Sequence, residues 1–177
     1  RIGCRDIIEI MEPVRALRSR LGIFETLDDI EENARLVQES AGVRLVPRRS
    51  GESYDGVTLT GLKPGIRRPE VARAALESVA AALRSDIADA VGEGALTEIY
   101  LGGQYAHHNL FVEIIADLNG LTIVRTETRD AVATAAACRA MIAAGAVPPA
   151  FERRRFNPTM PAARRDDLYA RWMVGRG

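Results

Sequence analysis

The sequence predicts an α/β domain in which helices cover a sheet that contains parallel strands. Two observations support this prediction. In the second half of the 177-residue chain, short β-rich runs alternate with helical patterns, and strand–helix–strand order requires the crossover connections of a parallel sheet. The composition, with 47% hydrophobic and 27% charged residues, is that of a soluble chain able to bury a core.

The first half of the chain predicts two helices followed by two short strands. Apolar side chains recur at helical spacing within residues 5–22, where Pro13 marks a start or a kink. Thr26 begins a sequence like a capping box, with Asp29 in place of Glu, and its helix is expected to run to Gly42. The two β-rich runs occupy residues 43–46 and 57–62, and the turn-like linker between them occupies residues 50–56.

The second half begins with a long helix that has Pro69 in its first turn and ends before Gly92. The elements expected after it are a strand at 98–101, a helix at 108–118, a strand at 121–125, an Ala-rich helix at 130–144 and a last helix at 165–173. The Ala-rich helix is interpreted as packing closely on the sheet, and a wall facing a ligand is the alternative. Cys138 lies in this helix, where we expect a buried, unreactive thiol.

Charge and cysteine content exclude several classes of function. Twenty-four basic residues balance 24 acidic ones, so neither nucleic acid nor a membrane surface is an expected partner, and the short arginine runs are interpreted as solvated faces. Two cysteines make no disulfide framework. Because no apolar stretch approaches ~18 residues and no signal peptide is recognised, we expect a cytoplasmic protein. The chain opens at Arg1, and we expect it to belong to a longer protein.

The residues with the clearest chemical meaning are Gly102 and Gly103, which lie between a strand and a helix. Glycine permits positive φ and a close backbone approach, and a helix N-terminus attracts anions. Ligands of open α/β sheets bind at the carboxyl ends of strands. The loop is therefore a candidate site for a phosphate or a purine, although two glycines alone more often mark a plain turn. His107 and His108 have no partner at metal-ligand spacing, so no metal site is expected.

Longer segments in the same order resemble the FGGY family of carbohydrate kinases, which includes glycerol kinases and xylulokinases. The run LTEIYLGGQYAHHNLFVEIIADLNGLTIVRTETRDAVATAAACRAMIAAGAV resembles the family's strand, Gly-Gly loop, helix, strand and acidic start of an Ala-rich helix. Upstream, GVTLTGLKPGIRRPEVARAALESVAAALRSDI is similar to the family's Gly-Leu-Thr loop and long helix. ALRSRLGIFETLDDIEENA, GVRLVPRRSG and FERRRFNPTMPAARRDDLYARWMVG also match family segments, so the resemblance covers about residues 14–174.

The resemblance implies an RNase H-like, actin-type ATPase fold, with a central mixed sheet flanked by helices. Residues 1–177 would form the C-terminal, nucleotide-binding domain of a two-domain kinase that uses ATP and Mg. The sugar or polyol would bind the N-terminal domain, which this chain lacks, and homo-oligomers such as a dimer are implied. The nucleotide-binding residues implied are Gly61, Gly65, Gly102, Gly103, Gln104, His108, Asn109 and Asp130.

The roles implied for these residues differ. Gly61 and Gly65 would lie near the phosphates or the ribose, and either His108 or Asn109 would contact adenine. Asp130 and the alanines after it would form the wall beside the base. The family's catalytic base belongs to the N-terminal domain, so no catalytic residue and no metal ligand is expected in this segment, which alone is expected to be inactive.

Three interpretations remain open from the sequence. The chain is a domain of a working ATP-dependent carbohydrate kinase, or a degenerate homologue that binds nucleotide or a partner without turnover, or an unrelated α/β domain with a structural Gly-Gly loop. Departures from the family pattern at Leu101, Gln104 and Ala135 motivate the second interpretation.

Overall fold

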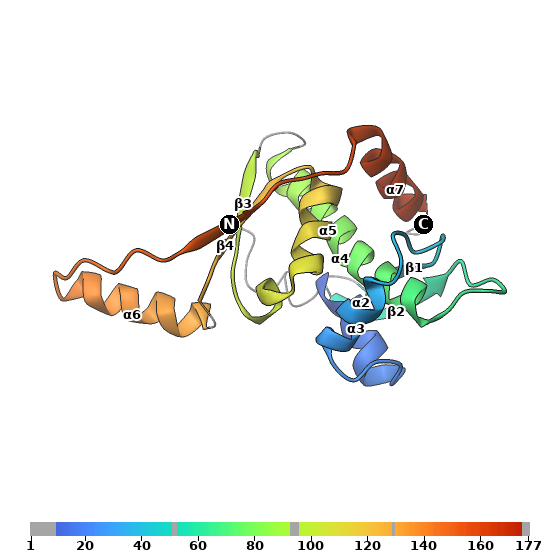
Figure 1. The fold of residues 1–177 in the computed structure, drawn as a ribbon, viewed down its shortest axis with the longest axis horizontal. Coiled ribbons are helices and arrows are strands. Elements are labelled where there is room, and N and C mark those ends of the chain that lie inside the picture. Colours follow the sequence, from blue (N-terminus) through green and yellow to red (C-terminus); the bar gives the residue numbers. More distant parts are fainter. Residues whose placement is uncertain (1–9, 51–52, 93–95, 129, 175–177) are drawn as a thin grey trace.

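The computed structural model describes residues 10–50, 53–92, 96–128 and 130–174. Its elements alternate helices and strands along the chain (Figure 1). They are the α-helix α2 (Glu12–Arg15), the π-helix η1 (Ala16–Arg20), α3 (Leu27–Ala34), β1 (Arg44–Ser50), β2 (Ser53–Thr60), α4 (Arg68–Val91), β3 (Glu98–Leu101), the 3₁₀ helix η2 (Gln104–His107), α5 (Asn109–Asn119), β4 (Thr122–Thr126), α6 (Ala131–Ala143), β5 (Arg153–Phe156) and α7 (Ala162–Val174).

The described strands form two sheets. β3 and β4 pair in parallel, with Tyr100 opposite Val124, and β5 pairs antiparallel with the other edge of β4. The parallel pair and the mixed α/β class are therefore confirmed. β5 was not expected, because its sequence is an arginine run that ends in Phe156, and its side chains other than Phe156 are exposed. β1 and β2 form a separate antiparallel hairpin with a bulge between Arg48 and Arg49.

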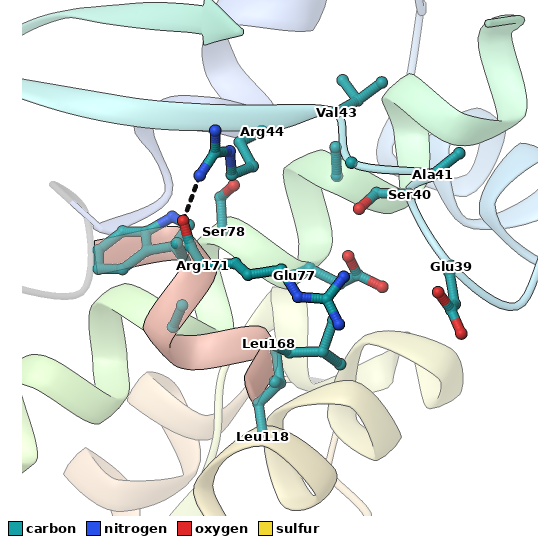
Figure 2. Close-up of a pocket in the computed structure, with 14 residues that line it drawn as sticks. Glu39, Ser40, Ala41, Val43, Arg44, Glu77, Ser78, Leu118, Leu168 and Arg171 are labelled. Atoms are coloured by element: carbon teal, nitrogen blue, oxygen red, sulfur yellow. Dashed lines mark hydrogen bonds between the residues drawn. The ribbon is translucent and has the colours of Figure 1, made fainter. Parts of the chain in front are cut away.

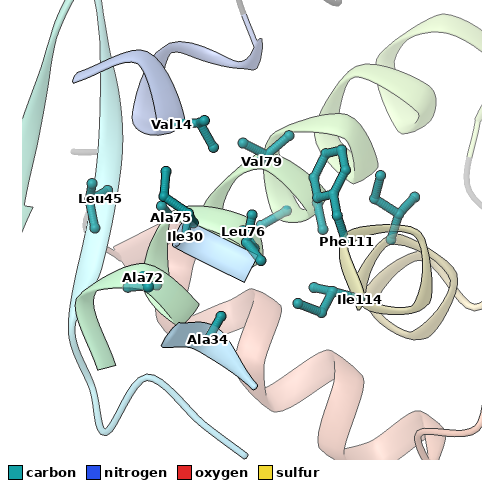
Figure 3. Close-up of a cluster of buried hydrophobic side chains, with 14 of the residues drawn as sticks. Val14, Ile30, Ala34, Leu45, Ala72, Ala75, Leu76, Val79, Phe111 and Ile114 are labelled. Carbon is teal, nitrogen blue, oxygen red and sulfur yellow. The ribbon is translucent and has the colours of Figure 1, made fainter. Parts of the chain in front are cut away.

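The long helix α4 is the centre of the core. The alanines in the first two thirds of the helix have almost no exposed surface, and small side chains let neighbouring elements approach the helix closely. They are Ala72, Ala74, Ala75, Ala80, Ala81 and Ala82. α3, β1 and α5 pack around it (Figure 3). The side chains labelled in that view are Val14, Ile30, Ala34, Leu45, Ala72, Ala75, Leu76, Val79, Phe111 and Ile114, all buried. Because α4 contacts α3 on one side and α5 on another, it sets the positions of these two shorter helices relative to each other.

Helix boundaries differ from expectation mainly in the first half. Thr26 is the N-cap of α3, where its side chain accepts a hydrogen bond from the amide of Asp29, as predicted. The helix ends at Ala34 rather than near Gly42, since Leu36, the next large apolar side chain, is 72% exposed and has no core to face. The predicted helix at 5–22 falls partly outside the described residues and otherwise becomes α2 followed by η1.

The Ala-rich helix α6 stands away from the rest of the domain, at the end of the connections from β4 and to β5 (Figure 1). Its described side chains are exposed or half-buried, so the expectation that it packs closely on the sheet is wrong. Cys138 is half-buried and carries a free thiol, which also corrects the expected burial. Among the described elements, none packs extensively against α6. None of the helices in the described ranges could cross a membrane.

Candidate functional site

The Gly-Gly loop follows β3 and leads directly into a short helical turn. Gly103 has φ 94° and ψ 178°, a backbone conformation open essentially to glycine alone. The amide of Ala106 donates to the carbonyl of Gly103 at 3.1 Å and closes the 3₁₀ turn η2, after which α5 begins at Asn109. Gly102 and Gln104 are exposed. The backbone of this loop is thus accessible at the carboxyl end of a parallel strand, as the sequence predicted.

A buried arginine on β4 forms hydrogen bonds with residues that follow the Gly-Gly loop. Arg125 is 4% exposed, and its Nη1 donates to the carbonyl of Ala106 at 2.8 Å and to Oδ1 of Asn109 at 2.9 Å. Its Nε and Nη2 both donate to Oε1 of Glu127, at 2.9 and 2.7 Å. The guanidinium also lies 5.1 Å from the ring centroid of Phe156. Sequence reasoning missed this residue, although a charge inside the apolar run of β4 was a visible signal.

An acidic residue from α3 occupies the start of α5. Glu31 accepts hydrogen bonds from the Leu110 amide at 2.6 Å and from Arg35 at 2.6 Å, and its other oxygen lies 3.0 Å from Nδ1 of His108. Burial opposes ionisation of Glu31, but the bonds from His108 and Leu110 and the charge of Arg35 outweigh it and hold its pKa below the ordinary value. An internal carboxylate, rather than a vacant anion site, therefore faces this helix N-terminus.

A second connection links the Gly-Gly loop to the start of α6. The ring nitrogen Nε2 of His107 lies 3.1 Å from the carbonyl oxygen of Thr128, and the Thr128 hydroxyl bonds the Thr134 hydroxyl in α6. Asp130 is the N-cap of α6 and accepts a hydrogen bond from the Ala133 amide at 2.9 Å. Asp130, one of the predicted nucleotide-binding residues, therefore lies two residues after Thr128, which contacts the loop. In the structure its side chain caps α6.

The remaining predicted residues, Gly61 and Gly65, lie in the connection from β2 to α4. Both have positive φ, 78° and 93°. A side chain on Gly61 would overlap the carbonyl oxygen of Gly42, whereas the space beside Gly65 is open. Within the described residues, no hydrogen bond or ion pair joins this connection to the Gly-Gly loop. Gly102, Gly103, Gln104, His108 and Asn109 lie in one segment, and Gly61 and Gly65 lie in a different connection.

An apolar cavity of about 580 Å³ borders the Gly-Gly loop. It lies between β3, α4 and α5, and Gly102 and Tyr105 contribute the loop side of its lining. The other walls are mostly aliphatic, including Leu83 from α4 and Ile99 from β3, with Phe111 from α5. Such a lining suits a flat apolar or aromatic group and offers no charge to bind phosphate.

A second cavity, of about 290 Å³, lies between β1, α4 and α7 (Figure 2). Arg44 donates to the carbonyl oxygen of Arg171 there, which ties the hairpin to α7. The charged groups at its edge are already paired, Glu77 with Arg73 and Glu39 with Arg164. This cavity contains none of the predicted nucleotide-binding residues, and its contacts anchor α7. No group of His, Cys, Asp and Glu suited to hold a metal occurs in the part of the chain that the structure describes.

Solved structures of sugar and polyol kinases share this architecture. Plasmodium falciparum glycerol kinase, solved with ADP, matches with a TM-score of 0.72 at 16% identity, over 94% of this chain and 36% of that one. A ligand-bound xylulose kinase from Lactobacillus acidophilus matches with a TM-score of 0.73 at 19% identity, over 93% and 37%. This likeness shows the fold, which is the actin-type ATPase fold.

The sequence comparison defines the family more closely. Residues 37–144 match the C-terminal domain of the FGGY family of carbohydrate kinases, and the chain belongs to that family. Glycerol kinase from Aromatoleum aromaticum is 35% identical over 174 residues, which cover 90% of this chain and 35% of that protein. Glycerol kinase from Thermus brockianus is 36% identical over 167 residues, covering 86% and 34%. The interpretation as an unrelated α/β domain is therefore wrong, and the chain spans about 35% of the length of such relatives.

Proposed function

We propose that this chain is the nucleotide-binding half of an ATP-dependent kinase that transfers a phosphoryl group to a hydroxyl of a sugar or polyol. The observation that carries the proposal is the Gly-Gly loop at the carboxyl end of β3, in a domain of the FGGY family. A backbone free of side chains at Gly102 and Gly103 allows close approach of a nucleotide. The apolar cavity beside the loop supplies a wall for its base.

The loop residues have separate roles in this proposal. The glycines and Gln104 lie along the nucleotide, and Asn109 offers an amide to the base. Gly61 and Gly65 stay candidates for contacts to the phosphates or the ribose, and Asp130 stays a candidate for the wall beside the base. Mg accompanies ATP in this proposal and would be held largely by the phosphates, and the proposed role of this chain is to bind and orient the nucleotide.

The general base that deprotonates the acceptor hydroxyl is proposed to lie outside this domain. Among the carboxylates near the loop and the start of α5, Glu31 and Glu127 are engaged by arginines, and Asp28 lies beside His108 with an 81% exposed side chain. Glu31 also has a lowered pKa for the reasons given above, and a carboxylate stabilised in its charged form is a weak base. We infer that the isolated domain binds nucleotide without turnover, and that closure against a substrate domain would complete the site.

Glycerol is the first acceptor to test, since the curated relatives are glycerol kinases. Solved neighbours are also a xylulose kinase and a gluconate kinase, so xylulose and gluconate belong in the same panel. The full-length gene product is assayed for ADP release with each acceptor, and ATP affinity is measured by calorimetry. ATP binding with acceptor-dependent ADP release supports the proposal.

Other outcomes separate the remaining interpretations. ATP binding by the full-length protein with no ADP release on any acceptor would favour the degenerate homologue, which binds nucleotide without turnover. No binding of ATP or ADP at millimolar concentration would overturn the nucleotide-binding role itself. The 177-residue chain, assayed in parallel, is expected to release no ADP above the level of a protein-free control.

A further inference from the structure

Arg125 is a buried charge near the Gly-Gly loop with several hydrogen-bonding partners. Its four hydrogen bonds reach three groups, the carbonyl of Ala106, the amide oxygen of Asn109 and the carboxylate of Glu127. Ala106 lies in η2, Asn109 begins α5, and Glu127 follows the last residue of β4. A buried charge is costly unless it is paired and hydrogen-bonded, and these bonds connect β4 to η2 and to the start of α5.

The arginine also determines how the Asn109 side chain is oriented. A guanidinium has five N–H donors and no acceptor, so the Asn109 atom 2.9 Å from Nη1 must be the carbonyl oxygen. The amide NH₂ of Asn109 then points away from Arg125. Because Asn109 is half-buried, this edge is the part of the side chain left for a ligand. The loop therefore presents a hydrogen-bond donor at this position and no acceptor.

We propose that Arg125 is a positioning residue for nucleobase recognition, which fixes the Asn109 amide so that its NH₂ donates to an acceptor nitrogen of the base. This inference rests on the proposed function. Arg125 itself does not touch the ligand and acts through Asn109 and the Ala106 carbonyl. A lysine at this position offers one compact ammonium, which cannot reproduce the planar set of bonds to three partners.

Two substitutions in the full-length gene product test the inference. Asn109→Asp keeps an oxygen for Arg125 and replaces the NH₂ donor with a second acceptor, so ATP affinity is expected to fall on the order of tenfold or more while thermal stability is kept. Arg125→Lys is expected to weaken ATP binding similarly, and adding Asn109→Ala to it is expected to cost little more. Arg154→Lys is the matched control, since exposed Arg154 also lies over Phe156, and it should bind like wild type.

The readout that separates positioning from general structure is the ratio of affinities for ATP and inorganic tripolyphosphate. Loss of base recognition lowers ATP affinity and leaves tripolyphosphate affinity unchanged, and this result supports the inference. If the wild type binds ATP and Asn109→Asp binds it equally well, the inference is overturned and the proposed function stays intact. Equal losses for both ligands also overturn it. If the wild type fails to bind ATP, the proposed function falls and this inference with it. Should Arg125→Lys not fold, unchanged ATP binding by Asn109→Asp still overturns the inference, because that variant preserves the arginine's contact and removes only the amide donor.

Discussion

The carboxylate of Glu31 lies 3.0 Å from the imidazole of His108, and this contact joins α3 to the start of α5 across 77 residues of sequence. The same carboxylate accepts the amide hydrogen of Leu110. One of the two residues considered for adenine contact is thus held inside the domain, with a side chain 16% exposed. Asn109, the neighbour, is bound through its oxygen and retains its amide donors.

The lowered pKa of Glu31 predicts a pH-dependent stability. Since its folded pKa lies below the ordinary value of 4.5, the contribution is present above pH 4.5 and is lost as the pH falls through the folded pKa. Glu31→Gln is expected to cost about 1–3 kcal/mol of unfolding free energy near neutral pH, with the deficit shrinking in acid. Urea unfolding across pH measures this. Asp28→Asn, at an 81% exposed side chain near the same histidine, is the control, and an equal effect there would contradict the assignment.

The roles of His108 and Asn109 are expected to separate on substitution. Asn109→Ala should weaken ATP binding by ~1–3 kcal/mol, the range for a lost buried hydrogen-bond partner. His108→Ala should lower stability through loss of the Glu31 contact and leave ATP affinity nearly unchanged. Calorimetric titration and thermal unfolding of both variants check this. The reverse pattern would place the adenine contact one residue earlier.

Gly103→Val is expected to abolish nucleotide binding while the domain stays folded. No atom of another residue lies within 4 Å of a side chain placed there, so the fold has room, but φ 94° strains a β-branched residue by about 1–3 kcal/mol. Relief of that strain should displace the loop. Gly145→Val has a positive φ of 76° and equally open space, and it lies after α6, outside the loop. We expect Gly145→Val to retain nucleotide binding and Gly103→Val to lose it. Full nucleotide affinity in both variants would refute the loop as the binding site.

Gly61 and Gly65 form a second matched pair. Gly65→Ala is expected to cost only backbone strain, about 1–3 kcal/mol, because its surroundings are open. Gly61→Ala should cost clearly more, since its new methyl group would overlap the backbone of Gly42. Unfolding free energies of the two variants make the comparison. Equal costs would show that the close approach of Gly61 to Gly42 does not restrain the connection.

The capping role of Asp130 predicts a local effect. Asp130→Ala removes the acceptor for the Ala133 amide and is expected to cost the first turn of α6 ~0.5–2 kcal/mol, with Asp130→Asn nearly neutral. Hydrogen exchange of the α6 amides measures this directly. If Asp130→Asn also weakens ATP binding, the carboxylate itself contributes to the nucleotide site, as the family resemblance implies.

Some elements were predictable because a strong local signal specified them. The strand at 98–101, the long helix ending before Gly92 and the cap at Thr26 match the structure closely, since each depends on periodicity or on a side chain that bonds its own helix. The Gly-Gly loop was also located from a local signal, two adjacent glycines between a strand and a helix. β5 was missed because an arginine-rich segment becomes a strand only when the free edge of β4 is there to pair with it.

The sequence by itself determined the α/β class, the FGGY resemblance and the segment that carries the candidate site. Only the tertiary structure showed that Glu31 occupies the start of α5, that Arg125 donates to Asn109, and that Gly61 closely approaches the backbone of Gly42. These relationships join residues far apart in the chain or fix the rotation of one side chain. Both depend on how α3, α4 and α5 pack together, and no local pattern encodes that packing.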